Sequence, residues 1–436
     1  MRFGSSGGRW TLGLAAVLAV NLWGLALVLR PGDLWGDPAN RDLQALLETT
    51  REEPGLVRWF LGDWPLGNGF YRPLPSLTFK LDDLLHADNL RGYRFTNWLI
   101  CAGCSFLLVW FVWEVLRSRR CAIGCGALLA AWQSDLVLFL PMEGASWAVA
   151  AVLVVYGLVY GRSGRWCFLA AAAIVVLVGQ EMQAALPYRE IDSQTLGFRV
   201  IEWPPGRTAT LMTLFGLTSL GAYCRFEREG LVGWGLLSLA ALTAALGCYE
   251  QAAVLPAALL GCAVTLRFQG VSVRWLWHLM PWTLVGAYLF LHTALLPADT
   301  SYRVQQARAV SGGIRDLAIW LFRPVRPAID TKVLIAPEIG FAVVVLSGFW
   351  LNLARVLAYT AAYFEARRAW LPILFGLLGS TGAYAALAFQ HPFAHYFYFP
   401  FAFRTVFVAA LIALAWKTVV TGASRRALPA PGKRAP

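Results

Sequence analysis

Long apolar runs recur along the chain, and they restrict the folds that this sequence can adopt. Hydrophobic residues make up 58% of the sequence and charged residues only 14%, whereas a soluble domain is about a quarter charged. A helix needs about 20 apolar residues to cross a bilayer, so the runs of adequate length predict about twelve spans. Their approximate bounds are residues 10–30, 95–116, 121–141, 146–161, 166–183, 208–224, 231–249, 252–267, 275–296, 338–362, 369–389 and 402–420. The sequence therefore predicts an all-α, polytopic membrane protein in which residues 1–436 form a single transmembrane domain.

Basic residues fall in short loops between alternate spans rather than in one patch. Short cytoplasmic loops of membrane proteins are enriched in Lys and Arg. We therefore expect a multi-pass protein with both termini in the cytoplasm and a disordered basic tail over residues 421–436. This pattern accounts for most of the basic pI of about 9.5 without a nucleic-acid partner. The basic loops are Arg117–Arg120, Arg162–Arg165, Arg225–Arg228, Arg267–Arg274, Arg367–Arg368 and Arg425–Arg434.

A long polar segment, residues 31–94, separates the first two predicted spans. Spans can be joined by a few residues, so this first extracytoplasmic loop is expected to supply much of the protein's chemistry. Asp37 followed by Pro38 is a helix-start signal, and it predicts a helix that ends near Glu53. The sequence SLTFKLDDLLH predicts a second helix, because its leucines share one face and its charged residues another. Both helices are expected to lie flat on the outer membrane surface, and residues 297–337 form a second large extracytoplasmic loop.

The sequence GFYRPLPSLTFKLDDLLHADNLRGYRFTNWLI resembles the first outer loop of bacterial GT-C membrane glycosyltransferases, in the protein mannosyltransferase and TMTC-like branch. That loop carries a YRPL box, an amphipathic helix, and a G-Y-x-x-T-N pattern that leads into the second span. Three later stretches resemble the branch more loosely. Tyr249 stands where Lys is usual, and His395 stands where Arg is usual. The stretches are Glu202–Arg207 (an E-x-x-W-x-x-G-R element), Leu246–Gln251 (a Ser-Lys-Glu segment) and His395–Pro400 (an R-Y-x-Y-L-P-S box).

The resemblance implies a location in the bacterial cytoplasmic (inner) membrane. It also implies transfer of a sugar from a polyprenyl-phosphate carrier to an acceptor on the outer face. Such a transfer needs a carboxylate that takes the acceptor proton, and cations that stabilise the leaving phosphate. The family's base is an Asp shortly after the first span, and Asp37 is the best positional match, with Asp33 and Asp42 as the next candidates. The residues expected to bind the donor phosphate or the substrate are Tyr71, Arg72, Lys80, Glu202, Arg207, Glu250, His395, Tyr396 and Arg404.

The partners that the resemblance implies are a polyprenyl-phosphate sugar donor, membrane lipid, and an acceptor that is a glycan, a lipid or a protein. No cofactor is implied, and a divalent-metal requirement stays open. No Gly-rich phosphate loop follows a strand, which disfavours a nucleotide-sugar donor.

Each candidate site residue also has a structural interpretation. Asp37 before a proline is a good helix N-cap. Arg72 could instead form an ion pair with Asp82 or Asp83, or reach lipid phosphate. Arg404, like other arginines at the outer ends of spans, could anchor to head groups.

Two further functions are consistent with the same sequence. One is a catalytically degenerate scaffold subunit of a membrane complex, which the changes at Tyr249 and His395 favour. The other is a lipid or solute transporter, which the number of predicted spans suggests. A transporter would more often show broken helices with Gly/Pro pairs at the membrane midplane, and these are not evident.

Overall fold

The computed structural model describes residues 6–35, 40–53, 55, 57–67, 69–139, 142–159, 164–183, 195–295, 363–387 and 393–427. Every regular element in these ranges is a helix, which agrees with the predicted all-α class. Four helical segments are long and apolar enough to cross a membrane, so the chain has the character of a helical membrane protein. The four segments are Trp10–Val28, Leu90–Leu116, Glu250–Phe268 and Ala394–Ala423.

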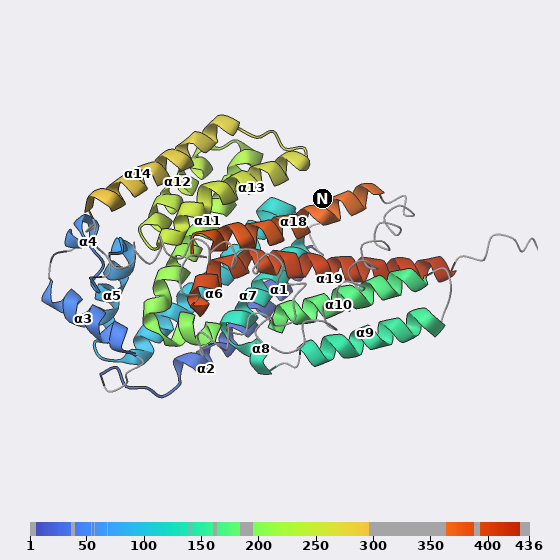
Figure 1. The fold of residues 1–436 in the computed structure, drawn as a ribbon, viewed down its shortest axis with the longest axis horizontal. Helices are drawn as coiled ribbons and strands as arrows, with labels where there is room; N and C mark the ends of the chain where they lie inside the picture. Colours follow the sequence, from blue (N-terminus) through green and yellow to red (C-terminus); the bar gives the residue numbers. More distant parts are fainter. Residues whose placement is uncertain are drawn as a thin grey trace, which may run out of the picture.

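The described helices follow the predicted apolar runs in order (Figure 1). The count of twelve spans stays a prediction, because the run at 338–362 and the loop at 297–337 lie outside the described residues. The helices that fall on predicted runs are α1 (Ser6–Trp23), α2 (Leu25–Val28), α6 (Leu90–Leu116), α7 (Arg119–Gln133), α8 (Leu136–Phe139), α9 (Met142–Val159), α10 (Arg165–Gln183), α11 (Arg207–Glu229), α12 (Val232–Leu246), α13 (Leu255–Phe268), α14 (Leu279–Leu295), α18 (Tyr363–Ala385) and α19 (Tyr398–Ala427).

The last helix corrects the prediction for the C-terminal tail. Helix α19 continues to Ala427, so residues 421–427 are helical and not disordered. Arg and Ala favour the helix interior, and no proline follows Pro400 before Pro429.

Helix α19 lies along the middle of the bundle and packs against α18, α10 and α7 (Figure 1). Its contact with α18 depends on small residues, because a Cβ at Gly376 would collide with the backbone of Phe407. Small residues let helix backbones approach closely, which is how membrane helices commonly associate.

Neutral buried polar groups also hold α19 in place. The hydroxyl of Tyr398 donates to Gln133 Oε1 at 2.6 Å, and Gln133 Nε2 donates to Asn21 Oδ1 at 2.8 Å. All three side chains are buried, so these hydrogen bonds are costly to lose. They link α1, α7 and α19, and they fix the start of α19 next to the candidate site described below.

The predicted span at 121–141 is broken at Asp135, between α7 and α8. Asp135 has a φ of 54°, in the left-handed region that Asp tolerates better than most residues. Its carboxylate accepts hydrogen bonds from the Gly197 amide at 2.9 Å and from the Thr195 hydroxyl at 2.5 Å. Asp135 therefore fastens the segment before Arg207 to the bundle.

The first outer loop folds into α3 (Arg41–Glu52), α4 (Arg58–Leu61) and α5 (Pro73–His86), which gather at one end of the molecule (Figure 1). Helix α3 begins at Arg41, and Asp37, the predicted N-cap, lies outside the described residues. One prediction about α3 is wrong, because its leucines do not face a membrane. Leu43, Leu46 and Leu47 are buried in a small core with Trp64, Phe70, Phe79 and Tyr93.

Helix α5 has the opposite orientation to a helix of a soluble protein. Its leucines Leu81, Leu84 and Leu85 are 55%, 79% and 66% exposed, whereas the charged Asp82 is buried. An outward apolar face is the arrangement expected of a helix that lies on a membrane surface. The predicted interfacial position of this second helix is therefore consistent with the structure.

The predicted topology gives a labelling test. In a variant without the eight native cysteines, a cysteine placed at Asn68 should react with a membrane-impermeant maleimide in intact spheroplasts. A cysteine at Ser118 should react only after the membrane is permeabilised, because it lies among the Arg-rich short loops. The reverse pattern would overturn the topology.

Candidate functional site

Arg72 and Glu250 meet at the end of the bundle that carries the first loop. Arg72 immediately precedes α5, and Glu250 begins a 3-10 turn, Glu250–Val254, before α13. Arg72 Nη2 donates to Glu250 Oε2 at 2.8 Å, and Arg72 Nε donates to Glu250 Oε1 at 3.3 Å. The Leu74 amide donates to the Gly247 carbonyl at 3.1 Å, so the first loop is attached by its backbone to the α12–α13 connection.

Aromatic rings enclose the Arg72 guanidinium. Its Cζ lies 4.0 Å from the ring centre of Phe70, 4.5 Å from that of Tyr249 and 5.6 Å from that of Trp64. Burial by itself lowers the pKa of Arg72, but the Glu250 carboxylate and the Tyr249 hydroxyl outweigh it and raise that pKa above its ordinary value. Arg72 is therefore a permanent cation in a fixed position.

Glu250 uses only part of the hydrogen-bonding capacity of Arg72. A guanidinium has five N–H groups, and the two bonds to Glu250 leave those of Nη1 available. Among the described residues no acceptor contacts the Arg72 Nη1. Arg72 can therefore bind a further anionic oxygen without first losing its carboxylate partner.

His395 and Tyr396 lie beside this pair. They belong to a 3-10 turn, Ala394–Phe397, that leads into α19. The Tyr396 ring is 6.1 Å from that of Tyr249, and the His395 ring is 4.6 Å from that of Tyr396. Tyr249 in turn lies against Arg72, whose Cζ is 4.5 Å from the centre of the Tyr249 ring. Three stretches far apart in the sequence, around residues 72, 250 and 395, thus form one group.

The segment that precedes α11 completes the group. It contains a π-helical turn, Phe198–Glu202, followed by a 3-10 turn, Pro204–Gly206. Arg199 Cζ lies 4.7 Å from the Trp203 ring centre, and that ring is 5.3 Å from His395. Gly206 is required here, because a Cβ would collide with the Arg199 carbonyl. We call the whole set the Arg72 cluster, and its members are Arg72, Arg199, Trp203, Tyr249, Glu250, His395 and Tyr396.

Two buried polar atoms beside or within the Arg72 cluster have no hydrogen-bond partner among the described residues. They are His395 Nδ1 and Gln251 Oε1. Buried polar atoms are usually paired, and an unpaired one costs about 1–3 kcal/mol. A ligand hydroxyl could satisfy either atom. No group of three or more metal-binding side chains occurs in the part of the chain that the structure describes.

Glu202, a predicted site residue, forms a second charged group with Arg30 and Arg94. Its carboxylate pairs with Arg30, and its carbonyl accepts a hydrogen bond from Arg94 Nε at 3.1 Å. Burial raises the pKa of the Glu202 carboxyl above its ordinary value, while Arg30 and Arg94 act in the opposite direction. Glu202 is adjacent in sequence to Trp203, so this charged group borders the Arg72 cluster.

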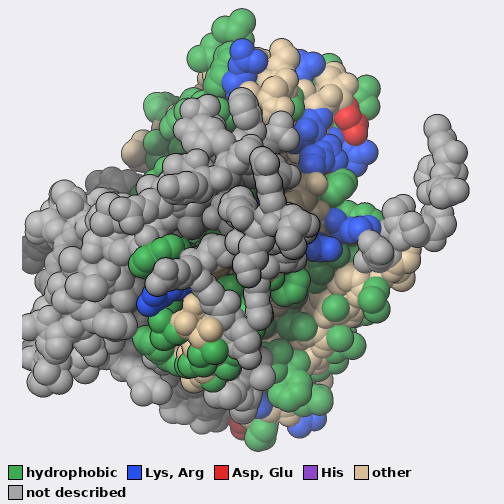
Figure 2. All heavy atoms as spheres, turned by 90° about the vertical axis from the view of Figure 1, so that its right-hand side faces the viewer, with side chains coloured by type: hydrophobic (Ala, Val, Ile, Leu, Met, Phe, Trp, Pro, Cys, Tyr) green, Lys and Arg blue, Asp and Glu red, His purple; other side chains and the backbone are tan. Residues whose placement is uncertain are grey.

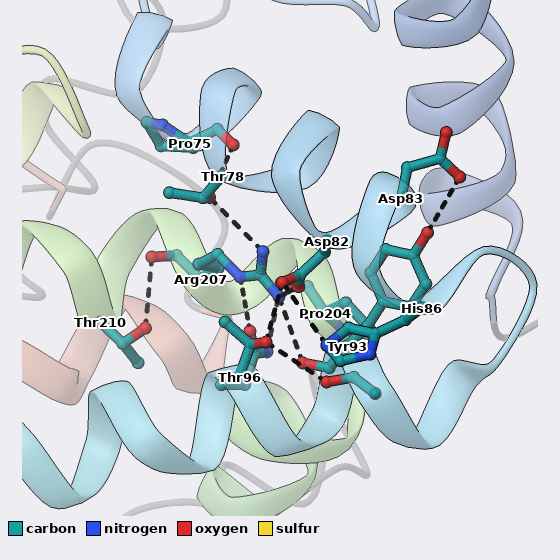
Figure 3. A network of polar contacts seen from close by, with 12 residues as sticks. Pro75, Thr78, Asp82, Asp83, His86, Tyr93, Thr96, Pro204, Arg207 and Thr210 are labelled. Atoms are coloured by element: carbon teal, nitrogen blue, oxygen red, sulfur yellow. Dashed lines mark hydrogen bonds and ion pairs between the residues drawn. The ribbon is translucent and has the colours of Figure 1, made fainter.

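Arg207 lies outside the Arg72 cluster, and its expected role in binding the donor stays a prediction. It is fully buried, and its Nη2 forms an ion pair with Asp82 Oδ2 at 2.5 Å. Figure 3 shows Arg207 at the centre of a polar network from three helices. Its Nε donates to Asn97 Oδ1 at 2.7 Å, its Nη2 also donates to the Tyr93 carbonyl at 3.1 Å, and its Nη1 donates to Thr78 at 3.4 Å. Each of its three nitrogens already has an acceptor, so Arg207 joins α5, α6 and α11.

Three other predicted residues make contacts with neighbouring elements. Lys80 Nζ donates to the Glu53 carbonyl at 2.8 Å, so it caps the C-terminus of α3. The Tyr71 hydroxyl donates to the Phe60 carbonyl at 3.2 Å, on the α4 side of the loop. Arg404 Nη1 donates to Ser380 Oγ at 3.2 Å, which ties α19 to α18. Donor binding by these side chains stays a prediction.

The predicted bases have separate positions. Asp33 is exposed and accepts from the Trp35 amide at 3.2 Å. Asp42 is exposed in the first turn of α3. Asp37 lies outside the described residues, so its candidate role stays a prediction.

Sequence reasoning missed Phe70, Arg199 and Trp203, whose contact with the site depends on folding. The aromatic residues next to predicted cations were the available signal, because Arg commonly stacks on aromatic rings. The alternative partners for Arg72 were also wrong. Its carboxylate is Glu250, because Asp82 pairs with Arg207 and Asp83 pairs with Arg51.

Comparison of this chain with protein-family models, curated proteins and solved structures found no match. Function must therefore be inferred from the geometry of the residues themselves.

Proposed function

We propose that this protein is an integral membrane glycosyltransferase that moves a sugar from a polyprenyl-phosphate donor to an acceptor at the end of the bundle that holds the Arg72 cluster. One observation supports this proposal above the others. Arg72, Glu250 and His395 come from three stretches that resemble GT-C glycosyltransferases, and these stretches meet in one place. A cation with spare donors lies there within a group of aromatic rings.

The proposed reaction matches the groups present. The acceptor hydroxyl attacks the anomeric carbon of the donor sugar, and the bond from that carbon to the phosphate oxygen breaks. The phosphate leaves with the electron pair, and a carboxylate takes the hydroxyl proton. Arg72 and Arg199 stabilise the charge that develops on the leaving phosphate, while the exposed leucines of α5 provide an apolar surface for the isoprenoid chain. A single displacement of this kind inverts the anomeric carbon.

The carboxylate that accepts the proton must be free to do so. Glu250 and Glu202 are each paired with an arginine, so neither is a strong candidate in this arrangement. An aspartate after the first span remains the proposed base, with Asp37 first and Asp33 and Asp42 after it. The protein lies in the bacterial inner membrane in this proposal, with the Arg72 cluster on the outer side.

A scaffold role is the second candidate, and one observation favours it. The Arg72–Glu250 ion pair forms without a ligand, and Tyr249 and His395 differ from the residues usual in the family. In a scaffold these contacts would hold the first loop in place and bind no substrate.

Arg72 variants distinguish the two functions. Arg72→Ala should lower sugar transfer by about 10²-fold or more, since loss of one preorganised donor to a developing oxyanion has an effect of about 10²–10³. Arg72→Lys should lose less, because it keeps the charge but not the planar fork. Transfer would be measured with purified protein and radiolabelled polyprenyl-phosphate sugars.

Arg51→Ala is the matched control, because Arg51 is an exposed cation of the same loop that pairs with Asp83 and Asp88. It should leave the transfer rate unchanged. Equal loss of thermal stability in both Arg72 variants, with a transfer rate that merely follows the folded fraction, would favour the scaffold. So would absence of transfer by the wild-type protein with every polyprenyl-phosphate sugar tested.

A further inference from the structure

Residues 267–280 connect α13 to α14. One side of this connection is hydrogen-bonded to the bundle, and the other side is exposed. Helix α13 begins near the Arg72 cluster, so its C-terminal end lies about 20 Å away along the helix axis, at the opposite end of the bundle. Three polar contacts attach this connection to α6 and α11. They are Gln269 Nε2 to the Val115 carbonyl at 2.8 Å, the Arg274 amide to Glu227 Oε2 at 3.0 Å, and His278 Nε2 to the Tyr223 hydroxyl at 2.8 Å.

The outer side of residues 267–280 is apolar and aromatic. Phe268 is 75% exposed, Trp275 is 49% exposed and Leu276 is 82% exposed. Leu279 and Met280 continue this surface into α14 and are also exposed. Large apolar side chains that are held outward by a fixed backbone are the usual form of a membrane-surface anchor, with Trp at the level of the head groups.

Positive charge is in excess at this end of the bundle. The α6–α7, α11–α12 and α13–α14 connections, together with the helix turns next to them, contain seven arginines and three glutamates. Figure 2 shows Lys and Arg side chains gathered beside hydrophobic ones on this end of the molecule. Arg267 is exposed and has no ion-pair partner in the described ranges. The arginines are Arg117, Arg119, Arg120, Arg225, Arg228, Arg267 and Arg274, and the glutamates are Glu114, Glu227 and Glu229.

Arg228 adds to this excess of positive charge, because within the described ranges it pairs with carbonyl oxygens and with no carboxylate. Its Nε donates to the Glu114 carbonyl at 2.9 Å and its Nη2 donates to Gln269 Oε1 at 2.7 Å. Arg117 reaches the same turn through its ion pair with the Glu114 carboxylate at 2.7 Å. Arg228 and Arg117 therefore share Glu114 as a partner, and Arg228 also contacts Gln269, which is two residues after Arg267 in the chain.

We infer that residues 267–280 form a binding site for an anionic phospholipid, with the phosphate on Arg267 and Arg228 and the acyl chains against Phe268, Trp275 and Leu276. The lipid phosphate supplies the negative charge that this end lacks. The acyl chains cover an apolar surface that would otherwise be exposed to water. Covering it gains about 25 cal/mol of free energy per Å² of apolar surface removed from water. A soluble anion would gain only the first of these interactions.

Lipid titration monitored by native mass spectrometry tests this site. Full-length protein in mild detergent should bind dioleoyl phosphatidylglycerol at least about five-fold more tightly than dioleoyl phosphatidylcholine, since one basic residue near an anionic lipid accounts for about that factor. Arg267→Gln should reduce affinity for phosphatidylglycerol about five-fold and leave phosphatidylcholine unaffected. The double change Phe268→Ser and Leu276→Ser should weaken binding of both lipids.

Arg91→Gln is the matched control, because Arg91 is an exposed arginine at the start of α6, at the other end of the bundle. It removes the same charge and should leave both affinities unchanged. Equal affinity of the wild-type protein for the two lipids would overturn the inference, as would an equal loss in Arg91→Gln. Equally tight binding of glycerophosphoglycerol, which lacks acyl chains, would assign the site to a soluble anion and overturn it too.

Discussion

Asp82→Asn is expected to lower the free energy of unfolding by about 3–5 kcal/mol, because it removes one partner of a buried ion pair and leaves Arg207 as an uncompensated charge. Arg207 is fully buried, and its Nη2 lies 2.5 Å from Asp82 Oδ2. The same carboxylate accepts from the Thr96 hydroxyl at 2.8 Å. Loss of the charge should therefore loosen α5 from both α6 and α11, which a denaturant titration in detergent would measure.

The adjacent carboxylate is a matched control. Asp83 pairs with Arg51 at 2.7 Å, but the Arg51 side chain is 37% exposed. Ion pairs at an exposed surface contribute about 0–1 kcal/mol, so Asp83→Asn should change the stability by less than that. Similar losses in the two variants would contradict the fastening role of Arg207.

A double variant separates the charge from the packing. Asp82→Leu combined with Arg207→Met removes both charges and keeps apolar volume, and such replacements are often neutral or stabilising. The double variant should recover most of the stability that Asp82→Asn loses. If it is the less stable of the two, the remaining hydrogen bonds of Arg207 to α6 are the larger contribution.

Asp37→Asn is expected to lower sugar transfer by about 10²–10⁴-fold if Asp37 is the general base, because the amide cannot accept the proton of the acceptor hydroxyl. Asn caps a helix about as well as Asp, so this substitution should preserve any cap that the side chain at position 37 provides. Folding should be unchanged, and the effect should appear in the rate alone. Initial rates with a polyprenyl-phosphate sugar, together with a thermal unfolding curve, would check both expectations.

Asp42→Asn is the matched control for Asp37→Asn, because Asp42 is exposed in the first turn of α3. It should retain its rate and lose at most a few tenths of a kcal/mol from the helix dipole. Full activity of Asp37→Asn would assign the proton transfer to Asp33 or Asp42. A loss of stability in Asp37→Asn that accounts for the loss of rate would contradict a catalytic role.

The sequence by itself determined the class of the protein and the positions of its helices. A long apolar run is removed from water, whether it faces lipid or a protein core. Its backbone N–H and C=O groups must then pair with each other, and a helix achieves this within the run itself. The bounds of α6, α10 and α11 therefore lie close to their predicted runs. The outward leucine face of α5 was likewise readable, since the spacing of Leu77, Leu81, Leu84 and Leu85 places them on one side of a helix.

The tertiary structure alone decided which cations remain able to bind a ligand. Arg72 and Arg207 both lie in motif-like stretches, and local sequence gives them the same charge and the same number of donors. Arg207 meets Asp82, 125 residues earlier in the chain, and uses all three of its nitrogens in the interior. Arg72 meets Glu250, 178 residues later, and keeps donors free at the edge of the bundle. Whether a charge is already satisfied depends on contacts between distant segments, and only the packing of the helices establishes those contacts.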